Sequence, residues 1–345
     1  MLWGLLAALL SLLSLAIVSA AKADVAHNDS LLIPPQVDGK PVQVRVGLFL
    51  NNLIDVDEVK ELFQISGYLF MTWKDPRLVF SPRPGAEQRE YTPDEIWIPS
   101  LLMINATANR QKVTANIKGD PDGTIHYIEL FQAELTTSFY LEPFPFDSQS
   151  LEIFLQPFLD ERDTVAMVYD EPNSGVGTEP FVELAQWKIL GFNASQQTRE
   201  LGRTGKKIPE LEIDLQVQRR SRYYIWKVFL PLIVMVAIAY SAFWIKIGDY
   251  YTQISITLTA ILTEIAFLFA ISSSLPKVPY LTFIDAFFLV SFVFSFVSML
   301  ELVVVHQALE WEWPDHANRI RRISQLLYPL IYVASVGAVA VVFFG

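Results

Sequence analysis

The stretch ISITLTAILTEIAFLFAISSSL, residues 254–275, has the length and apolar content of a bilayer-spanning helix, which takes roughly 20 residues, but it intersperses small hydroxyls among its apolar side chains. On a helix, steps of four and three residues place one set of these side chains on a single face. That set is Ser255, Thr259, Leu262, Ala266, Phe269 and Ser273. Hydroxyls can replace part of an ion's hydration, and a ring of apolar side chains can close a narrow pore by dewetting. The face therefore predicts a pore lining shared by several copies, because one helix cannot enclose water.

Two features of this stretch leave alternatives open. Its serine and threonine hydroxyls can instead bond the backbone of their own helix, which bilayer helices tolerate. Glu264 lies off the polar face, so we expect it to face neighbouring helices. A carboxyl at the middle of a bilayer helix is costly and suggests a function. Glu264 is predicted to be either a protonated hydrogen-bonding group or a proton sensor.

Three further apolar runs predict bilayer helices at residues 224–245, 283–305 and 323–344, and these look lipid-facing nearly throughout. The loops between helices one and two and between helices three and four carry basic residues. These are Lys246, Arg319, Arg321 and Arg322. Basic loops favour the cytoplasmic side, so the chain is predicted to begin and end outside the cytoplasm.

The chain begins with a stretch, residues 1–23, that has the apolar core and the small-x-small end of a cleavable export signal. Residues 24–222 carry most of the charge of a chain whose net charge is −11, and residues 223–345 are mostly apolar. An acidic part joined to an apolar part predicts two domains. Because there is no cysteine, neither a disulfide nor a thiolate metal site can form.

The acidic domain reads as β structure. Short alternating runs, for example residues 42–50, 67–73 and 124–134, are separated by turns rich in proline, glycine and asparagine. Many short strands over such a length predict a β-sandwich. We find no catalytic triad, no metalloprotease motif, no phosphate loop and no basic patch for nucleic acid. The sequence therefore predicts no enzyme, no cofactor and no metal site.

Motifs along the whole chain resemble those of a known family. Phe144-Pro145-Phe146-Asp147, followed by Ser148-Gln149, resembles the core signature of the pentameric ligand-gated ion channels, the Cys-loop receptors. Supporting matches follow in the same order as in that family: Trp73-Lys74-Asp75, Trp97-Ile98-Pro99, an arginine cluster before the first helix, Leu230-Pro231, and Leu275-Pro276-Lys277-Val278-Pro279-Tyr280. The two cysteines that flank the family signature are replaced by Thr137 and Leu151, and the link between helices three and four is short. Both departures resemble the bacterial branch.

The resemblance implies a homopentamer with a ten-stranded, immunoglobulin-like β-sandwich outside the membrane and a pore lined by the second helix. Leu262 would then be the central gate. Tyr251 stands where cation-selective relatives have a glutamate, and the arginine of anion-selective relatives is also missing. Asp249 lies two residues further out, and five copies would form an acidic mouth. We therefore expect monovalent cations to permeate.

The agonist site implied by the resemblance is an aromatic box between neighbouring subunits. Tyr68 and Phe158 match two of its aromatic positions, where a ring could bind an ammonium group. Ile104 stands at a third position that is usually aromatic. The expected tip, residues 199–207, begins at Arg199 and is cationic, which suits a carboxylate. The alternative is that Tyr68 and Phe158 are ordinary core residues of the sandwich.

The resemblance also implies a site that couples the two domains. Asp147 and Arg219 match an acid–base pair at the boundary between the sandwich and the membrane, and Asp57 matches a second acid beside them. Lys277 and Pro279 lie in the loop that would receive the motion. Breaking a buried pair leaves an unpaired charge, so such a pair can transmit movement. The alternative is that Arg219 only flanks the membrane.

The resulting prediction is a homopentameric channel in a bacterial plasma membrane, with its sensing domain in the periplasm. It is gated by an unknown small molecule or by protons. The rival prediction is a membrane-anchored receptor that binds a small molecule and conducts nothing.

Overall fold

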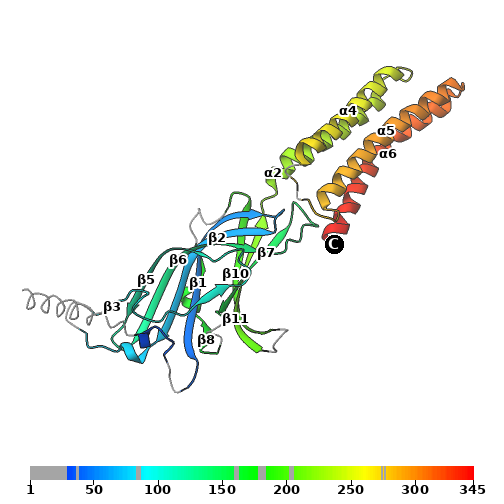
Figure 1. Cartoon of the computed structure of the whole chain (residues 1–345). Helices are drawn as coiled ribbons and strands as arrows, with labels where there is room; N and C mark the ends of the chain where they lie inside the picture. Colours follow the sequence, from blue (N-terminus) through cyan, green and yellow to red (C-terminus); the bar gives the residue numbers. More distant parts are fainter. Residues whose placement is uncertain are drawn as a thin grey trace, which may run out of the picture.

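The computed structural model describes residues 29–35, 39–82, 87–158, 163–177, 184–201, 206–272, 275 and 277–345. A β-sandwich is followed along the chain by a bundle of helices, which extends away from one end of the sandwich (Figure 1). The predicted export signal (residues 1–23), Ser273, Pro276 and part of the cationic tip (residues 202–205) lie outside the described residues.

The sandwich has one sheet of seven strands and one of four. The larger sheet has the order β3-β5-β6-β2-β1-β8, with β9 paired to β1, and the smaller has the order β10-β11-β7-β4. The larger sheet consists of β1 (Val42–Asp57), β2 (Leu62–Lys74), β3 (Arg89–Glu90), β5 (Gln111–Gly119), β6 (Thr124–Thr136), β8 (Val165–Tyr169) and β9 (Gly175–Val176). The smaller sheet consists of β4 (Leu101–Met103), β7 (Ser148–Pro157), β10 (Trp187–Leu201) and β11 (Lys206–Arg219). The family resemblance implied ten strands. The described residues form eleven, of which β3 and β9 have only two residues each.

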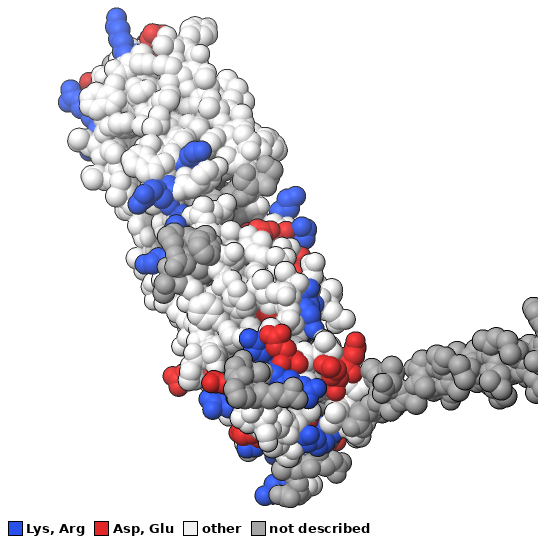
Figure 2. Space-filling view, turned by 90° about the vertical axis from the view of Figure 1, so that its left-hand side faces the viewer, with Lys and Arg blue, Asp and Glu red and all other residues white. Residues whose placement is uncertain are grey.

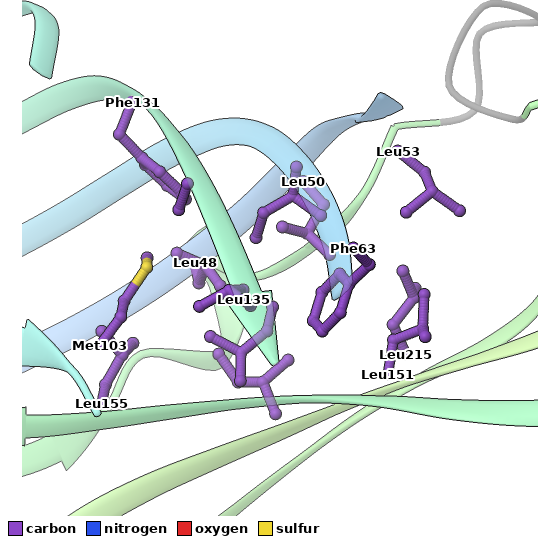
Figure 3. Close-up of a cluster of buried hydrophobic side chains, with 14 of the residues drawn as sticks. Leu48, Leu50, Leu53, Phe63, Met103, Phe131, Leu135, Leu151, Leu155 and Leu215 are labelled. Carbon is purple, nitrogen blue, oxygen red and sulfur yellow. The ribbon is translucent and has the colours of Figure 1, made fainter. Parts of the chain in front are cut away.

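Strict alternation decides which side chains enter the core. Along β2, Phe63, Ile65, Gly67, Leu69, Met71 and Trp73 are buried, whereas the residues that alternate with them are partly exposed. Strand β2 pairs antiparallel with both β1 and β6. Strand β6 continues the same alternation, whereas β1 departs from it where the register shifts after Leu50 and after Leu53. Figure 3 shows Phe63 of β2, with Leu48 of β1 and Leu135 of β6, close to Leu151 and Leu155 of β7 and Leu215 of β11 between the two sheets. A one-residue slip would turn every core residue outward, so the apolar pattern sets the register.

Among the described residues, four helices are long and apolar enough to cross a bilayer. The first span, Arg222–Trp244, comprises α2 (Arg222–Tyr224), a π-helical turn (Ile225–Phe229), α3 (Leu230–Ser241) and a 3₁₀ turn (Ala242–Trp244). It is followed by α4 (Tyr250–Ile271), α5 (Phe283–Glu310) and α6 (Pro314–Phe344). Pro231 has no N–H to donate to the turn before it, so the π-helical turn stands where regular bonding is lost.

Two helices begin earlier than their apolar runs suggested. Helix α4 begins at Tyr250 rather than at residue 254, because Asp249 accepts a hydrogen bond from the Thr252 N–H at 3.4 Å and caps the first turn. Helix α6 begins at Pro314 rather than at residue 323, so only residues 311–313 separate it from α5. Its polar first turns stay helical outside the apolar run, and proline suits a first helical position.

Charged side chains are distributed unevenly between the sandwich and the helices. In Figure 2 acidic and basic side chains gather on the sandwich, whereas the helical half shows a broad uncharged band with lysine and arginine toward its ends. The chain is therefore a multi-pass membrane protein with a β-sandwich outside the bilayer and four spanning helices.

Candidate ion pathway and coupling site

Helix α4 has two unlike faces. The predicted pore residues that the structure describes are all exposed in the single chain: Ser255, Thr259, Leu262, Ala266 and Phe269. The other face packs against neighbouring helices through Gln253, Thr257, Ala260, Ile261 and Glu264, all of them buried. Leu262 and Phe269 are 57% and 74% exposed, respectively. The hydroxyl-bearing face is thus free to meet water or another copy of the chain.

The hydroxyls on α4 do bond their own backbone, but this leaves their oxygens available. Thr259 Oγ1 donates to the Ser255 carbonyl at 2.6 Å, and Thr263 Oγ1 donates to the Thr259 carbonyl at 2.7 Å. Each hydroxyl proton therefore points along the helix. The oxygen lone pairs remain free to accept from water or to coordinate a cation. The backbone-bonding alternative and the pore lining are compatible.

The end of α4 farther from the sandwich is exposed and carries an acidic residue. Asp249 is exposed although it caps the helix, and Tyr251 is 88% exposed. Glu264 lies on the opposite face, where the Ser295 hydroxyl of α5 donates to Glu264 Oε1 at 2.6 Å. The carboxyl of Glu264 therefore faces the interior of the bundle and not the hydroxyl-bearing face.

Arg219, the last residue of β11, lies at the centre of a buried cluster where the sandwich meets the helices. Its Nε and Nη2 donate to the two carboxylate oxygens of Asp147 at 2.7 and 3.2 Å. The guanidinium carbon lies 4.7 Å from the ring centre of Phe144 and 4.2 Å from that of Trp187. Burial alone would lower the pKa of Arg219, but the charges and hydrogen bonds of its acidic partners raise it. The bidentate geometry and the two rings hold this cation in one orientation.

The second acid beside Arg219 is Glu58, and the prediction of Asp57 was wrong. Arg219 Nη1 donates to Glu58 Oε1 at 2.7 Å. Asp57 turns instead to its own loop, where it accepts from the Lys60 backbone N–H at 3.0 Å and pairs with the Lys60 side chain at 2.8 Å. Aspartate favours this local turn bond, which directs its side chain away from the cluster.

We expect this difference to show in stability. Replacing Glu58 by glutamine removes a charged partner of a buried cation, which should lower the free energy of unfolding by about 1.5–3 kcal/mol. Replacing Asp57 by asparagine should change it little, because its partner Lys60 is exposed and asparagine can accept the same turn bond. Chemical unfolding of the two variants in detergent compares them directly. Equal losses would contradict the assignment of Glu58.

The signature loop touches the helices through backbone bonds and aromatic rings. The N–H groups of Phe283 and Ile284 at the start of α5 donate to the carbonyls of Glu142 and Phe144 at 2.8 and 3.3 Å. Pro145 is buried, and its bond with Phe144 is cis. The ring of Phe146 lies 6.0 Å from Phe229, 5.8 Å from Phe283 and 5.8 Å from Phe344. The loop therefore contacts the first span, α5 and the end of α6 together.

The loop before α5 meets the sandwich at Tyr280, a residue of the family motif that was not predicted to take part in coupling. The Leu141 N–H donates to the Tyr280 hydroxyl at 3.2 Å. Lys277 and Pro279, the predicted receivers of the motion, are exposed. Trp187 and the phenylalanines of the helices were also missed, because nothing in their local sequence distinguishes them from ordinary core residues.

Two of the predicted ligand residues line the same cavity. Ile104 and Phe158 border a space of about 660 Å³ in the sandwich. Arg110, Lys112, Tyr127 and Glu129 line it as well. Tyr68 is not among the lining residues, since it lies on the outward side of β2. Arg199 is exposed, and it donates to Glu210 at 3.3 Å, so its charge is partly compensated.

The polar wall of this cavity is a buried network. Arg110 Nε donates to Glu129 Oε1 at 2.8 Å, and the Tyr127 hydroxyl donates to Glu129 Oε2 at 2.6 Å. Burial alone would raise the pKa of Glu129, but Arg110 outweighs it and holds that pKa below its ordinary value. Burial raises the pKa of Tyr127. The network is therefore an ionised pair with a neutral phenol, which gives a ligand both acceptors and donors.

Comparisons with known proteins agree with this arrangement. The family description of the neurotransmitter-gated ion-channel ligand binding domain matches residues 22–221, and that of the neurotransmitter-gated ion-channel transmembrane region matches residues 228–331. The chain is 30% identical over 319 residues to a proton-gated ion channel of Gloeobacter violaceus, covering 92% of this chain and 88% of that protein. It is 26% identical over 313 residues to the human gamma-aminobutyric acid receptor subunit rho-3, covering 87% of this chain and 65% of that subunit. The chain therefore belongs to the neurotransmitter-gated ion-channel family, in its branch without cysteines, and it is not an enzyme.

Proposed function

We propose that this chain is the subunit of a homopentameric, cation-selective channel in a bacterial plasma membrane, with the sandwich in the periplasm. The observation that carries the proposal is the exposed face of α4. A face with two small hydroxyls, Ser255 and Thr259, gains nothing from contact with lipid tails. In a ring of five copies this face of α4 would line a central water-filled pore, and Leu262 would lie at its narrow centre.

The stimulus acts on the sandwich in this proposal. Phe158 and Ile104 border the cavity, whereas Tyr68 lies on the outward side of the larger sheet. One chain therefore does not bring the three together, and an aromatic box would need Tyr68 from a neighbouring copy. A small carboxylate or amine suits the mixed wall of Arg110 and Glu129. Protons are the second candidate, since a relative over most of the chain is named a proton-gated channel.

Coupling follows from the Arg219 cluster. Asp147 belongs to the signature loop, Glu58 to the turn after β1, and Arg219 to the strand that continues into the first span. A movement of the sandwich at any of these three places shifts the charge balance of the others. Phe146 and Tyr280 carry the shift to the helices. Ligand or proton binding thereby biases a closed–open equilibrium.

Current recording from purified protein in planar bilayers tests the proposal. A pH series comes first, followed by a screen of small amines and carboxylates at fixed pH. Cation-selective unitary currents support the channel. Ligand binding by scintillation or calorimetry without any current, in wild type and in pore variants, would support the non-conducting receptor instead.

Charge selectivity gives a sharper prediction. A cation about 5 Å from one carboxylate in water is stabilised by roughly 0.8 kcal/mol, enough to concentrate cations roughly fourfold at the mouth. Asp249→Asn keeps the helix cap but removes this charge, so outward cation conductance, which is supplied from this mouth, should fall at least about twofold. The reversal potential in a salt gradient should move toward zero. Asp315→Asn, an equal change at the exposed start of α6, should alter neither.

A further inference from the structure

The interior of the helical bundle is more polar than its apolar runs suggested. Ser291, Ser295 and Ser298 are fully buried on α5. Their spacing of four and three places them on one face of that helix. This helix was expected to be lipid-facing nearly throughout, and the expectation was wrong for this face. The serines point into the protein.

Helix α6 supplies polar partners along the same line. The Tyr332 hydroxyl lies 3.0 Å from Ser291 Oγ. Further toward the cytoplasm, Tyr328 faces Ser298, and Arg321 lies near Glu301. Because α5 and α6 run in opposite directions, these pairs form successive levels, of which the last two belong to one polar file. We use this term for Glu264, Ser295, Ser298, Glu301, Arg321 and Tyr328; Ser291 and Tyr332 form a separate bonded pair beyond Glu264.

Glu264 joins the file from α4 through its bond with Ser295. The ionisable groups that face it are the phenols of Tyr328 and Tyr332 on α6. Helix α5 brings Ser295 beside it and Glu301 roughly 9 Å nearer the cytoplasm, from a rise of 1.5 Å per residue. From α3, Tyr240 stacks on Tyr328 at 5.4 Å. In the part of the chain that the structure describes, Glu264 accepts its hydrogen bond from Ser295, and no lysine, arginine or histidine bonds to it.

Unpartnered polar atoms gather in this file. Six buried side-chain polar atoms have no hydrogen-bond partner among the described residues, and all but Trp73 Nε1 belong to the file. They are Glu264 Oε2, Glu301 Oε1, Glu301 Oε2, Arg321 Nε and the Tyr328 hydroxyl. Buried polar groups in proteins are satisfied by protein or by ordered water. Water has the size and the donors and acceptors that these groups need.

The file reaches the cytoplasmic end of the bundle at Arg321. Its Nη1 and Nη2 donate to the carbonyls of Ile245 and Ala242, each at 3.1 Å. These carbonyls end the first span, and exposed Lys246 follows. In the opposite direction the unpartnered atoms stop at Glu264, because Ser291 and Tyr332 satisfy each other. The open end of the file is therefore the cytoplasmic one.

We propose that ordered waters in this file form a proton path within each subunit, separate from the ion pathway, which connects the cytoplasm with Glu264. A proton from a cytoplasmic hydronium passes to the Glu264 carboxylate, leaving one water and the neutral acid. Within the described ranges, neither Glu264 Oε2 nor the Tyr328 hydroxyl has a direct hydrogen-bond partner, so an ordered water would link them. The neutral acid can donate to that water, whereas the carboxylate can only accept from it. The proton state of Glu264 on α4 thus changes its water-mediated link to α6 in response to cytoplasmic pH.

Infrared spectroscopy tests the path without any current. The infrared band of the protonated Glu264 carboxyl is identified as the one that Glu264→Gln removes. In reconstituted protein transferred to D₂O at a series of pH values, the shift of this band measures how fast the carboxyl proton exchanges for deuterium. We expect exchange within the mixing time in the wild type and slowing of roughly tenfold or more in Tyr328→Phe and in Glu301→Leu. Ser291→Ala, an equally buried change beyond Glu264, should exchange like the wild type. Unchanged exchange in Tyr328→Phe, or no protonated band, overturns the path.

Excised patches test the sidedness, and this part rests on the proposed channel. One part of the change in current with pH should disappear in Glu264→Gln. This part should occur in the wild type when the pH changes on the cytoplasmic side, and it should be absent when the pH changes on the outer side. The same response from the outer side overturns the proposal. If the protein never conducts, the proposed function fails, but the infrared exchange still decides on the path.

Discussion

Replacing Leu262 by serine is expected to leave the channel conducting without any stimulus. Leu262 is the most central apolar residue on the exposed face of α4, and in a pentamer five copies meet at the axis. Losing even about 1.5 kcal/mol of apolar contact per copy removes more than the roughly 5.5 kcal/mol that converts a closed pore into an open one. The hydroxyl also wets the constriction. Resting current in bilayers, and block of that current by a large organic cation, would measure the effect.

The matched control is Leu268→Ser on the same helix. Leu268 is also exposed, but it lies about 120° round the helix from Leu262 at 3.6 residues per turn. The same chemical change there should leave resting current at the wild-type level. Equal leak from both variants would show that the hydroxyl loosens the bundle in general. No leak from Leu262→Ser would remove Leu262 as the gate.

Replacing Arg219 by glutamine is expected to be the most damaging single change in the sandwich. It leaves Asp147 buried without its cation, and breaking a buried pair in this way costs about 3–5 kcal/mol. The rings of Phe144 and Trp187 lose the cation between them as well. We expect a large loss of unfolding free energy and, in protein that still assembles, loss of the response to a stimulus.

Two further variants separate folding from coupling. Arg219→Lys retains a charge but cannot form the bidentate bond to Asp147, so it should fold better than the glutamine variant and still respond weakly. Arg222→Gln removes an exposed arginine three residues along and should behave like the wild type. If Arg219→Gln has the unfolding free energy of the wild type and its current responds to a stimulus like that of the wild type, the cluster has no part in coupling.

The sequence predicted the features that depend on spacing within one element. The two faces of α4 follow from steps of three and four, and the inward side of β2 follows from alternation. Asp147 and Arg219 were identified because each lies in a motif of the family, although 72 residues separate them. Contacts of this kind cannot be derived from spacing, and the family resemblance supplied them.

The features that the sequence did not reveal depend on side-chain direction after the chain has turned. Asp57 and Glu58 are neighbours of equal charge, and only the local bond of Asp57 to the Lys60 N–H decides which one reaches Arg219. Trp187 meets Arg219 because β10 pairs with β11 in a register that places them opposite each other. Three serines within an apolar helix look like tolerated polar residues until the opposing tyrosines are seen.

Helix α6 is held at both ends, and between them it packs against α5 through Tyr328 and Tyr332. Phe344 packs against the signature loop at one end, and Arg321 holds the end of the first span at the other. Most of the apolar surface between these points is exposed in the single chain. A bilayer that is thinner or thicker than this stretch tilts or strains the helix, because hydrophobic mismatch acts on its whole length. Membrane thickness thereby becomes a mechanical load on the junction between the two domains, applied from the lipid side.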